Sequence, residues 1–546
     1  MKFRVLKKIV KLMYGLSNFN GKPFRFLYET EYKKNIVTND LPESSQLDRA
    51  TPEEVGIERE RINTYFNLLE STSGIVAHSA IVTRHSKVIG EHSVYPYDKD
   101  VFHTSFSMSK SVVGLVVGIA IDEGYMRLED KIGDLVDFES YSIVPDDEVK
   151  EVTVKQLLNM TARVDYSEDG ALVEADWLKG FMEAGKKRGE GFAYNSMCTF
   201  VLAVLVGART GIDFSEYTRE KLFEPLGIKS AFFERNAVGQ VKGGFGLLIT
   251  VEDMAKLGNL VLNGGMYEGK RVVSQDYVTQ AVSVQSRAPE YVSKYDYGYQ
   301  IWTDREGEVY IFNGMFGQNV FIFPKTDIVV AVTGGDNDMF HDNPIFELTC
   351  RFFKDLDYIP QADKREGKGE NTLSIDWLCD KRFTFDKKAS RIGLMPIVSG
   401  VFQGTYPSGL KSLKFSNDTM LIEEYSSTYT IPLTTTPTRR VVDISGDRYE
   451  IASIARSEGD SLIVDVYFLE LVSKRRIIVT PCGDKITLSW SEEPGIDFLK
   501  GGRKLVLGAV KGKRFLTWLL SRRANWLWRR VSKTLSPKVV GKISDR

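Results

Sequence analysis

A serine and a lysine three residues apart are the first residues whose types and spacing could do chemistry. Ser107 and Lys110 form a Ser-x-x-Lys pattern at the start of an apolar stretch that predicts a helix over 108–124. Positions i and i+3 share one face of a helix, so the hydroxyl and the amine would lie within reach of each other. A lysine whose pKa is lowered by burial can take the proton of the serine and create a nucleophile. The same spacing recurs at Ser408 and Lys411 without a helix behind it, and a helix cap with a solvated lysine explains an isolated match better.

A tyrosine and a glycine-containing turn are two further candidates. Tyr194 comes shortly before the apolar run 200–206, and a phenol just before a helix can relay a proton at the rim of a site. The segment 313–318 reads Asn-Gly-Met-Phe-Gly-Gln between two strand-like runs, and its glycines allow backbone amides to approach a substrate closely. Seen alone, the tyrosine could equally be an aromatic core residue and the turn an ordinary hairpin.

The elements that must position these residues fall into two blocks. In the first block, up to about residue 357, helical periodicity alternates with short apolar strands. It predicts helices at 108–124, 154–160, 200–210 and 252–262, and strands at 79–83 and 320–323. After a polar linker, Val, Ile, Tyr and Thr dominate short runs between turn residues. This second block predicts a small all-β module with strands at 428–433, 461–469 and 476–480.

The order of these motifs resembles the serine β-lactamase and penicillin-binding-protein superfamily. In particular it is similar to the class C β-lactamase-like branch, which includes 6-aminohexanoate-dimer (nylon-oligomer) hydrolases and related esterases. The resemblance covers residues 50–360 and is carried also by the segments 152–161, 243–246, 252–258 and 297–302. It implies an α+β, β-lactamase/transpeptidase-like fold, with an antiparallel sheet flanked by helices and an all-helical subdomain.

The resemblance also implies a role for each motif residue. Ser107 would be the acylated nucleophile, Lys110 the adjacent base and Tyr194 the proton relay to the leaving group. The backbone amides of Ser107 and Met315 would form the oxyanion hole. Further residues of the same motifs would bind substrate: Tyr166, Asn195, Ser196, Gly314, Gly317 and Gln318.

Three departures from the family pattern narrow the expected activity. Position 196 is serine where many relatives carry the asparagine of Tyr-x-Asn, and 161–163 read Thr-Ala-Arg in place of Thr-Ser-Gly. Residues 312–314 read Phe-Asn-Gly in place of Lys-Thr-Gly or His-Thr-Gly, so a penicillin or D-Ala-D-Ala peptide would lose the usual cationic partner of its carboxylate. We therefore expect a serine hydrolase that cleaves amide or ester bonds of small molecules through an acyl-enzyme. A catalytically decayed scaffold or a membrane-surface binding protein is the alternative, and β-lactamase or D-Ala-D-Ala carboxypeptidase activity is less expected.

Other enzyme chemistries lack their sequence signatures. The chain has five histidines, and none accompanies a Gly-x-Ser-x-Gly elbow. His103, four residues before Ser107, could line the pocket entrance, but a structural role is favoured. No spaced metal-ligand set and no phosphate-binding glycine loop is found. We therefore expect neither a metal nor another cofactor.

Composition excludes several broad classes. Among 546 residues, 42% are hydrophobic and 27% charged, which excludes a wholly disordered chain, a collagen-like repeat and a polytopic membrane protein. With Lys+Arg 72 against Asp+Glu 73 the net charge is -1, so the chain is not a polycation for nucleic acid. The four cysteines lie far apart and indicate no disulfide framework or zinc cluster.

Basic residues gather at both ends of the chain. Residues 501–546 carry 13 basic residues and one acid, and arginines alternate there with Trp and Leu. This composition is typical of a helix on an anionic membrane surface, although a basic helix on the acidic core or a disordered tail would also fit. Without an export signal or transmembrane segment, we expect a cytoplasmic protein, with membrane association through this tail as an option. The predicted division is a basic arm (1–50), a hydrolase domain (51–360), a linker (361–371), an all-β domain (372–500) and a basic amphipathic tail (501–546).

Overall fold

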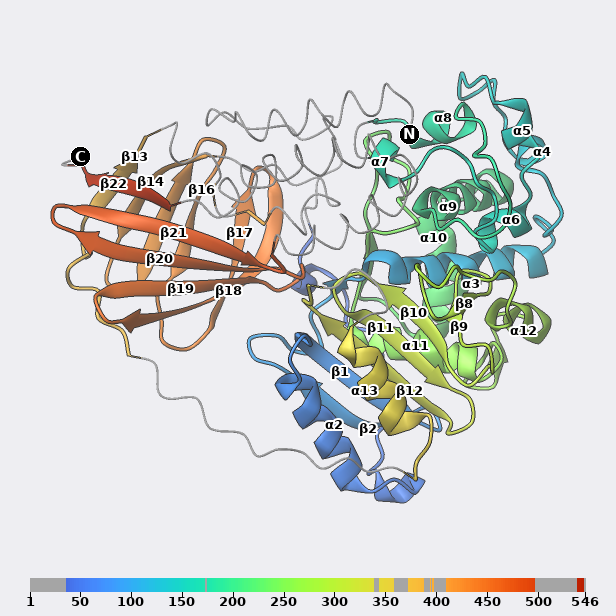
Figure 1. Ribbon diagram of the computed structural model, residues 1–546, viewed down its shortest axis with the longest axis horizontal. Coiled ribbons are helices and arrows are strands. Elements are labelled where there is room, and N and C mark those ends of the chain that lie inside the picture. The colour runs from blue at the N-terminus through green and yellow to red at the C-terminus, as the bar shows by residue number, and fades with distance from the viewer. Residues whose placement is uncertain are drawn as a thin grey trace.

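The computed structural model describes residues 36–171, 174–337, 343–357, 372–386, 393, 395–396, 409–495 and 538–544. These residues form a larger α+β domain and a ten-stranded β domain, which lie side by side (Figure 1). The predicted linker 361–371 lies outside the described residues. So do residues 1–35 and most of the basic tail, with the membrane contact predicted for it.

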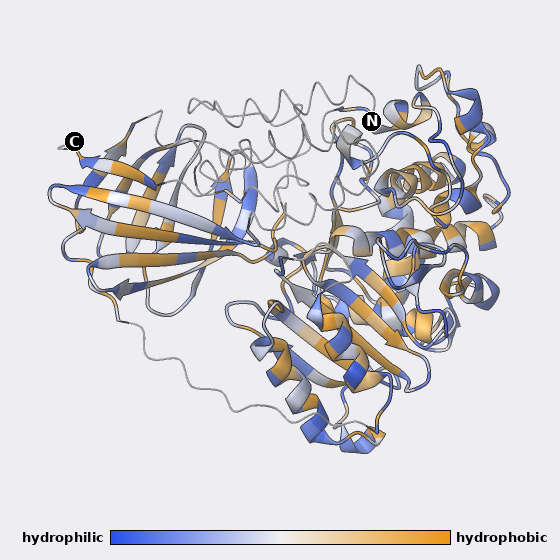
Figure 2. Ribbon diagram, in the orientation of Figure 1, coloured by the Kyte–Doolittle hydropathy of each residue, from blue (hydrophilic) through white to orange (hydrophobic). Residues whose placement is uncertain are grey.

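A seven-stranded antiparallel sheet is the centre of the larger domain. Its strands run in the order β2-β1-β12-β11-β10-β9-β8. Their bounds are β1 (Ala77–Arg84), β2 (Lys87–Ser93), β8 (Asp296–Tyr297), β9 (Trp302–Thr303), β10 (Tyr310–Gly314), β11 (Gln318–Phe323) and β12 (Ile328–Gly334). Every residue of β11 and β12 is buried, so both faces of the sheet centre are covered. Figure 2 shows these strands as largely hydrophobic.

Helices cover both faces of this sheet. Helix α11 (Val251–Leu262) packs against β1, β11 and β12. A Cβ atom at its Gly258 would lie 2.5 Å from a Val329 methyl carbon, so glycine is needed for this close approach. On β1 and β2 lies α2 (Arg59–Ser71), which packs in turn against α13 (Pro344–Phe353).

A helical subdomain stands beside the sheet. Its two long helices are α3 (Ser109–Asp122) and α9 (Ser196–Thr210), which pack on each other. Helix α3 is apolar and buried nearly all round, as expected for a helix inside a core. The shorter helices of the domain are α4 (Ile132–Leu135), α5 (Asp147–Lys150), α6 (Val154–Leu158), α7 (Glu168–Ala171), α8 (Trp177–Met182), α10 (Phe214–Thr218) and α12 (Gln275–Val282). The larger domain therefore has the predicted α+β architecture, an antiparallel sheet flanked by helices with a helical subdomain beside it.

The β domain is one antiparallel sheet in the order β16-β15-β14-β13-β22-β21-β20-β19-β18-β17. The strands are β13 (Arg382–Phe385), β14 (Leu410–Phe415), β15 (Thr419–Glu424), β16 (Thr428–Pro432), β17 (Thr438–Ile444), β18 (Asp447–Glu458), β19 (Ser461–Phe468), β20 (Lys474–Cys482), β21 (Lys485–Glu493) and β22 (Lys538–Ile543). The sheet curls into a barrel-like shape, and Ala455 N–H on β18 donates to Thr434 O just after β16 at 2.7 Å. The predicted all-β C-terminal domain is confirmed, but its predicted end at residue 500 is wrong, because β22 pairs with both β13 and β21.

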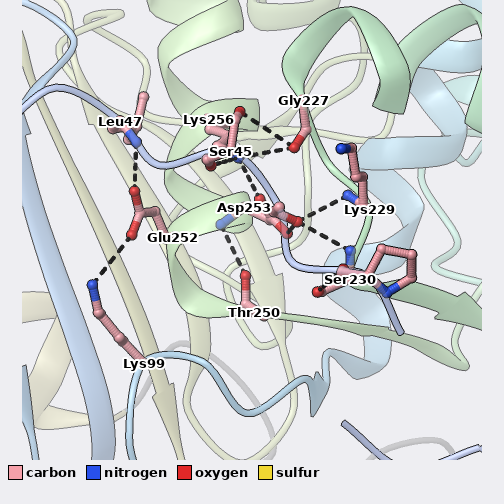
Figure 3. Close-up of polar contacts among 12 residues, drawn as sticks. Ser45, Leu47, Lys99, Gly227, Lys229, Ser230, Thr250, Glu252, Asp253 and Lys256 are labelled. Atoms are coloured by element: carbon pink, nitrogen blue, oxygen red, sulfur yellow. Dashed lines mark hydrogen bonds and ion pairs between the residues drawn. The ribbon is translucent and has the colours of Figure 1, made fainter. Parts of the chain in front are cut away.

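Residues 37–49, here called the N-terminal strap, connect the two domains. At its start, Thr38 N–H donates to the Glu470 carboxylate of the β domain at 2.7 Å. Further on, Leu47 N–H donates to the Glu252 carboxylate of α11 at 2.6 Å, a contact seen in Figure 3. This part of the predicted basic arm is therefore packed structure and belongs to neither domain alone.

Among the described residues, no single helix is long and apolar enough to cross a bilayer. The helical segments Ser196–Thr210 and Phe214–Leu226 reach the required length and hydropathy only together, and the chain bends by 86° between them.

Candidate active site

The predicted nucleophile lies on a tight turn between a short strand and a buried helix. The chain passes from β3 (His103–Thr104) into the 3-10 turn Phe106–Met108 and on into α3. Phe106 adopts a left-handed conformation with φ +46°, which is rare for a residue with a side chain. The turn is held from behind, since Ser105 N–H donates to Leu247 O at 2.8 Å. Ser107 is left half-exposed above the helix.

Lys110 lies directly beneath this serine. Its side chain is 1% exposed, and the ammonium Nζ donates to Ser107 Oγ at 2.9 Å and to Gly244 O at 2.6 Å. Burial lowers the pKa of Lys110 from 10.5 to about 7, and the negative charge of Glu168 offsets only part of that effect. An amine with such a pKa exchanges its proton readily near neutrality, as a general base must.

Tyr194 completes the group from another part of the chain. It lies just before α9, and its hydroxyl hydrogen-bonds the Ser107 side chain. Its ring centroid is 5.0 Å from Lys110 Nζ and stacks on Trp302 at 5.8 Å. Burial raises the pKa of Tyr194, so the phenol keeps its proton near neutrality. The structure thus brings a hydroxyl, an amine and a phenol together from segments some 80 residues apart.

The end of β10 brings a second backbone amide to the nucleophile turn. A Cβ atom at Gly314 would lie 2.1 Å from Ser105 O and 3.2 Å from Met108 N, so only glycine allows β10 to come this close. Met315 follows directly, and the turn into β11 is completed by Phe316 and Gly317, both with positive φ. The end of β10 thus lies against the nucleophile turn one residue before Met315.

Two residues predicted to bind substrate serve a helix terminus. Asn195 is the N-cap of α9: its Oδ1 accepts from Met197 N–H at 2.9 Å, and its Nδ2 donates to Tyr166 O at 2.7 Å. Ser196 is 3% exposed, and its N–H donates to Glu168 at 2.8 Å. Both polar groups of the asparagine side chain thus hold the start of α9 in place, and substrate binding by Asn195 stays a prediction.

Tyr166 and Gln318 are also used internally. The Tyr166 ring is 6% exposed and packs so closely on α7 and α8 that a Cβ atom at Gly170 or Gly180 would lie within 2.5 Å of it. The ring is thus held by packing inside the helical subdomain, and its predicted contact with substrate stays a prediction. Gln318 is fully buried, and its amide Nε2 donates to Phe316 O and Gly334 O, at 3.1 and 2.8 Å. Gln318 thus holds the turn between β10 and β11 from inside the protein.

Two groups that interact with Lys110 were not predicted from the sequence. Glu168, at the start of α7, is a carboxylate whose charge acts on Lys110 and Tyr194 and whose oxygen caps Ser196 N–H. The Gly244 carbonyl is an acceptor for Lys110. Glu168 sits in the acidic segment 165–169, which was a weak signal, whereas a backbone carbonyl leaves no signal in a sequence.

His103 has a structural role. Its ring is 3% exposed, and its Nε2 lies 3.0 Å from Nδ1 of His78. Burial lowers the pKa of His103 to about 4, so the ring is neutral near pH 7. Among the described residues no group of three or more His, Cys, Asp or Glu side chains could hold a metal ion.

The sheet, the helical subdomain and the Ser-x-x-Lys helix between them define a β-lactamase-like serine hydrolase fold. A family model described as Beta-lactamase matches residues 63–343, slightly more than half of the chain. The chain therefore belongs to the β-lactamase family.

Individual relatives are similar over the same region. The "6-aminohexanoate-dimer hydrolase" of Paenarthrobacter ureafaciens is 29% identical over 323 residues, covering 53% of this chain and 80% of that protein. A solved structure of a 6-aminohexanoate-dimer hydrolase candidate from Bacillus anthracis is 19% identical with a TM-score of 0.48, over 60% of this chain and 89% of that one. The octameric penicillin-binding protein homologue from Pyrococcus abyssi is 16% identical with a TM-score of 0.42, over 79% of this chain and 98% of that one. The family and the named relative support a hydrolase.

Proposed function

We propose that this protein hydrolyses amide or ester bonds of small molecules through an acyl-enzyme on Ser107. The observation that carries the proposal is the buried amine of Lys110, with its pKa lowered to about 7, in a 2.9 Å hydrogen bond with a half-exposed serine hydroxyl. Burying an amine without a hydrogen-bonded carboxylate costs stability, so this environment is not explained by a stabilising role of the lysine in the fold.

The two titratable partners of Ser107 divide the proton transfers. Lys110 in its neutral form accepts the Ser107 proton as Oγ attacks the substrate carbonyl carbon. Tyr194 keeps its proton because its pKa is raised, so it donates to the departing amine or alkoxide. The phenol then regains a proton from the Lys110 ammonium, whose Nζ lies 5.0 Å from its ring centroid. Water hydrolyses the acyl-serine by the same groups in reverse order.

The backbone amides of Ser107 and Met315 stabilise the tetrahedral oxyanion. Mutational loss of one such donor typically costs about 3–4 kcal/mol in the transition state. Gly314 makes this pairing sterically feasible. Because glycine has no side chain, the end of β10 can lie against the nucleophile turn.

Recognition at this site is expected not to depend on pairing a substrate carboxylate with a cation at the end of β10. Where penicillin-recognising relatives carry a cation, Phe312 is fully buried and Asn313 Nδ2 donates to Asn319 Oδ1 at 2.8 Å. No basic side chain occupies 312–314 to pair with a substrate carboxylate. The relative named 6-aminohexanoate-dimer hydrolase makes short linear amides the first substrates to test, with p-nitrophenyl esters as reactive surrogates.

The experiment combines covalent labelling with a substrate panel. A fluorophosphonate probe should label the native protein, and Ser107→Ala should abolish labelling. The matched control is Ser111→Ala, one turn along α3, which removes a buried hydroxyl that donates to Gln300 O at 2.7 Å and should leave labelling intact. Hydrolysis of p-nitrophenyl esters, the 6-aminohexanoate dimer, nitrocefin and a D-Ala-D-Ala peptide then ranks the substrate classes. Equal labelling of native protein and Ser107→Ala would overturn the assignment of Ser107 as the nucleophile. A native protein that is not labelled and turns over no panel member would favour a decayed scaffold.

A further inference from the structure

One turn of the β domain packs against the segments that flank Ser107 and Met315. It is the turn Leu469–Ser473 between β19 and β20, here called the junction turn, where the β domain meets the larger domain. The turn is closed on itself, since Phe468 N–H donates to Ser473 O and Leu471 N–H to Phe468 O, both at 3.0 Å. Val472 at its tip is 1% exposed, so the tip is covered by the other domain.

Val472 packs on both segments that carry the proposed oxyanion donors. It forms one apolar cluster with Phe106 and Phe316, and Met315 packs against that cluster. The two phenyl rings meet edge to face with centroids 5.1 Å apart. Phe106 immediately precedes Ser107, and Phe316 immediately follows Met315. The cluster therefore contains the neighbour in sequence of each residue whose amide is proposed to bind the oxyanion.

The backbone at both phenylalanines needs outside support. Phe106 and Phe316 have φ values of +46° and +64°, in the left-handed region that residues with a Cβ avoid. Such conformations persist only where the surroundings hold them, and they cluster at functional sites. Val472 is the residue that the β domain contributes to this cluster.

Hydrogen bonds fix the junction turn to the same region. Glu470 O accepts from Thr104 N–H at 3.0 Å, three residues before the nucleophile. The Glu470 carboxylate is 1% exposed and accepts from Thr38 N–H of the N-terminal strap at 2.7 Å. The turn is thus attached to the strap and to β3, and its position relative to Ser107 is set by backbone hydrogen bonds.

We propose that the junction turn is a positioning element of the active site, in which Val472 holds Phe106 and Phe316 so that the amides of Ser107 and Met315 converge on one oxyanion. This inference rests on the proposed acyl-enzyme function and extends it, because it makes the β domain part of the catalytic machinery. Val472 touches no substrate and acts through the two rings.

The test compares two equally buried valines of the β domain. Val472→Ala removes two methyl groups from the cluster, and Val464→Ala removes the same groups from the core of the same domain on β19. Three quantities are measured for each: kcat and KM on a p-nitrophenyl ester, the Kd of a phenylboronic acid that forms a tetrahedral adduct on serine, and the urea unfolding midpoint. Loss of one complete oxyanion donor costs roughly 100- to 1,000-fold in kcat, so a displaced donor is expected to cost about tenfold.

We expect Val472→Ala to lower kcat and weaken boronate binding by about tenfold each, with KM nearly unchanged. Val464→Ala should lower the unfolding midpoint but leave kcat and boronate affinity as in the native protein. Val472→Ile, which refills the space, should restore most of kcat. Equal kcat and boronate affinity in Val472→Ala and the native protein would overturn the inference and leave the proposed function standing, whereas a native protein that forms no serine adduct would overturn both.

A double-mutant cycle keeps the test decisive if Val472→Ala folds poorly. The two single variants are Val472→Ile in the β domain and Phe316→Leu in the larger domain, which alter the same apolar cluster. The double variant combines both substitutions. If the two side chains act through one contact, their effects on kcat are non-additive. Additive effects would contradict the proposed contact.

Discussion

Two buried lysines on two helices of the same domain have similar spacing to a hydrogen-bond partner but different charges around them. Lys110 on α3 is 1% exposed, and Lys256 on α11 is fully buried. Each bonds to the side chain three residues earlier on its own helix: Lys110 to the Ser107 hydroxyl at 2.9 Å, and Lys256 to an Asp253 carboxylate oxygen at 2.7 Å. Both also donate to a backbone carbonyl, that of Gly244 for the first and, for the second, one in the N-terminal strap (Figure 3).

The difference lies in one partner. A carboxylate balances the ammonium charge of Lys256, so that pair is a fixed clamp between α11 and the strap. A hydroxyl and a carbonyl offer dipoles but no opposite charge, so desolvation prevails at Lys110 and its pKa falls to about 7. Spacing and burial are shared, and the side chain at i−3 differs: a hydroxyl for Lys110 and a carboxylate for Lys256.

The largest expected effect comes from removing the base. Lys110→Met keeps the length of the side chain but has no group to accept the Ser107 proton, and general-base help is worth roughly 100- to 10,000-fold. We expect kcat/KM for a p-nitrophenyl ester to fall by that factor. The free energy of unfolding should be retained or raised, because a buried amine without a counter-charge is removed. Near-native kcat/KM in Lys110→Met would end its role as base.

Lys256→Met should show the opposite pattern. It leaves the Asp253 carboxylate buried without its cation, a change that typically costs about 3–5 kcal/mol of stability. We expect urea unfolding to shift by that amount, while kcat per labelled active site stays near native. Adding Asp253→Asn to this variant should recover part of the loss, because no isolated charge is then buried. A large fall in kcat with unchanged stability would erase the distinction between the two lysines.

The parts of the site that were predictable from the sequence are those set by local geometry. Ser107 and Lys110 lie within one turn of a helix, so their contact follows from spacing alone. The apolar run 200–206 predicted α9 behind Tyr194, although the helix begins earlier, at Ser196. Because the start of the helix was placed too late, the N-cap role of Asn195 was not predicted.

The remainder depends on contacts between distant segments. Glu168 meets Lys110 only because the helical subdomain folds α7 over α3 and α9, and no periodicity encodes that arrangement. The return of β22 to the β domain was missed because its six residues follow a long basic stretch that reads as a tail. Strand partners far apart in the chain are chosen by side-chain packing across the sheet, which a single sequence does not display.

The pH dependence of activity and of stability tests the lowered pKa of Lys110. With a pKa of about 7, the neutral fraction of Lys110 rises about tenfold from pH 5 to pH 6 and levels off above about pH 8. Because the neutral amine is the active form, we expect kcat/KM to rise through this range and reach a plateau. The folded-state pKa of Lys110 lies below its unfolded value of 10.5, so the unfolded chain binds more protons between these pH values. Native stability relative to Lys110→Met should therefore increase from pH 7 to pH 10. A flat activity profile from pH 5 to pH 9 would contradict this assignment.

The smallest expected effect concerns the carboxylate nearest to the base. The charge of Glu168 raises the pKa of Lys110 against desolvation, so Glu168→Gln, which keeps an oxygen for Ser196 N–H, should lower that pKa further. We expect the rising limb of the kcat/KM profile to move to lower pH by less than about one unit, with the plateau nearly unchanged. Glu174→Gln is the matched control, since this acid lies six residues further along the chain and is not among the charges that shift the pKa of Lys110. A move of the limb to higher pH would show that Glu168 acts on the site by another route, because removal of a negative charge cannot favour the ammonium form.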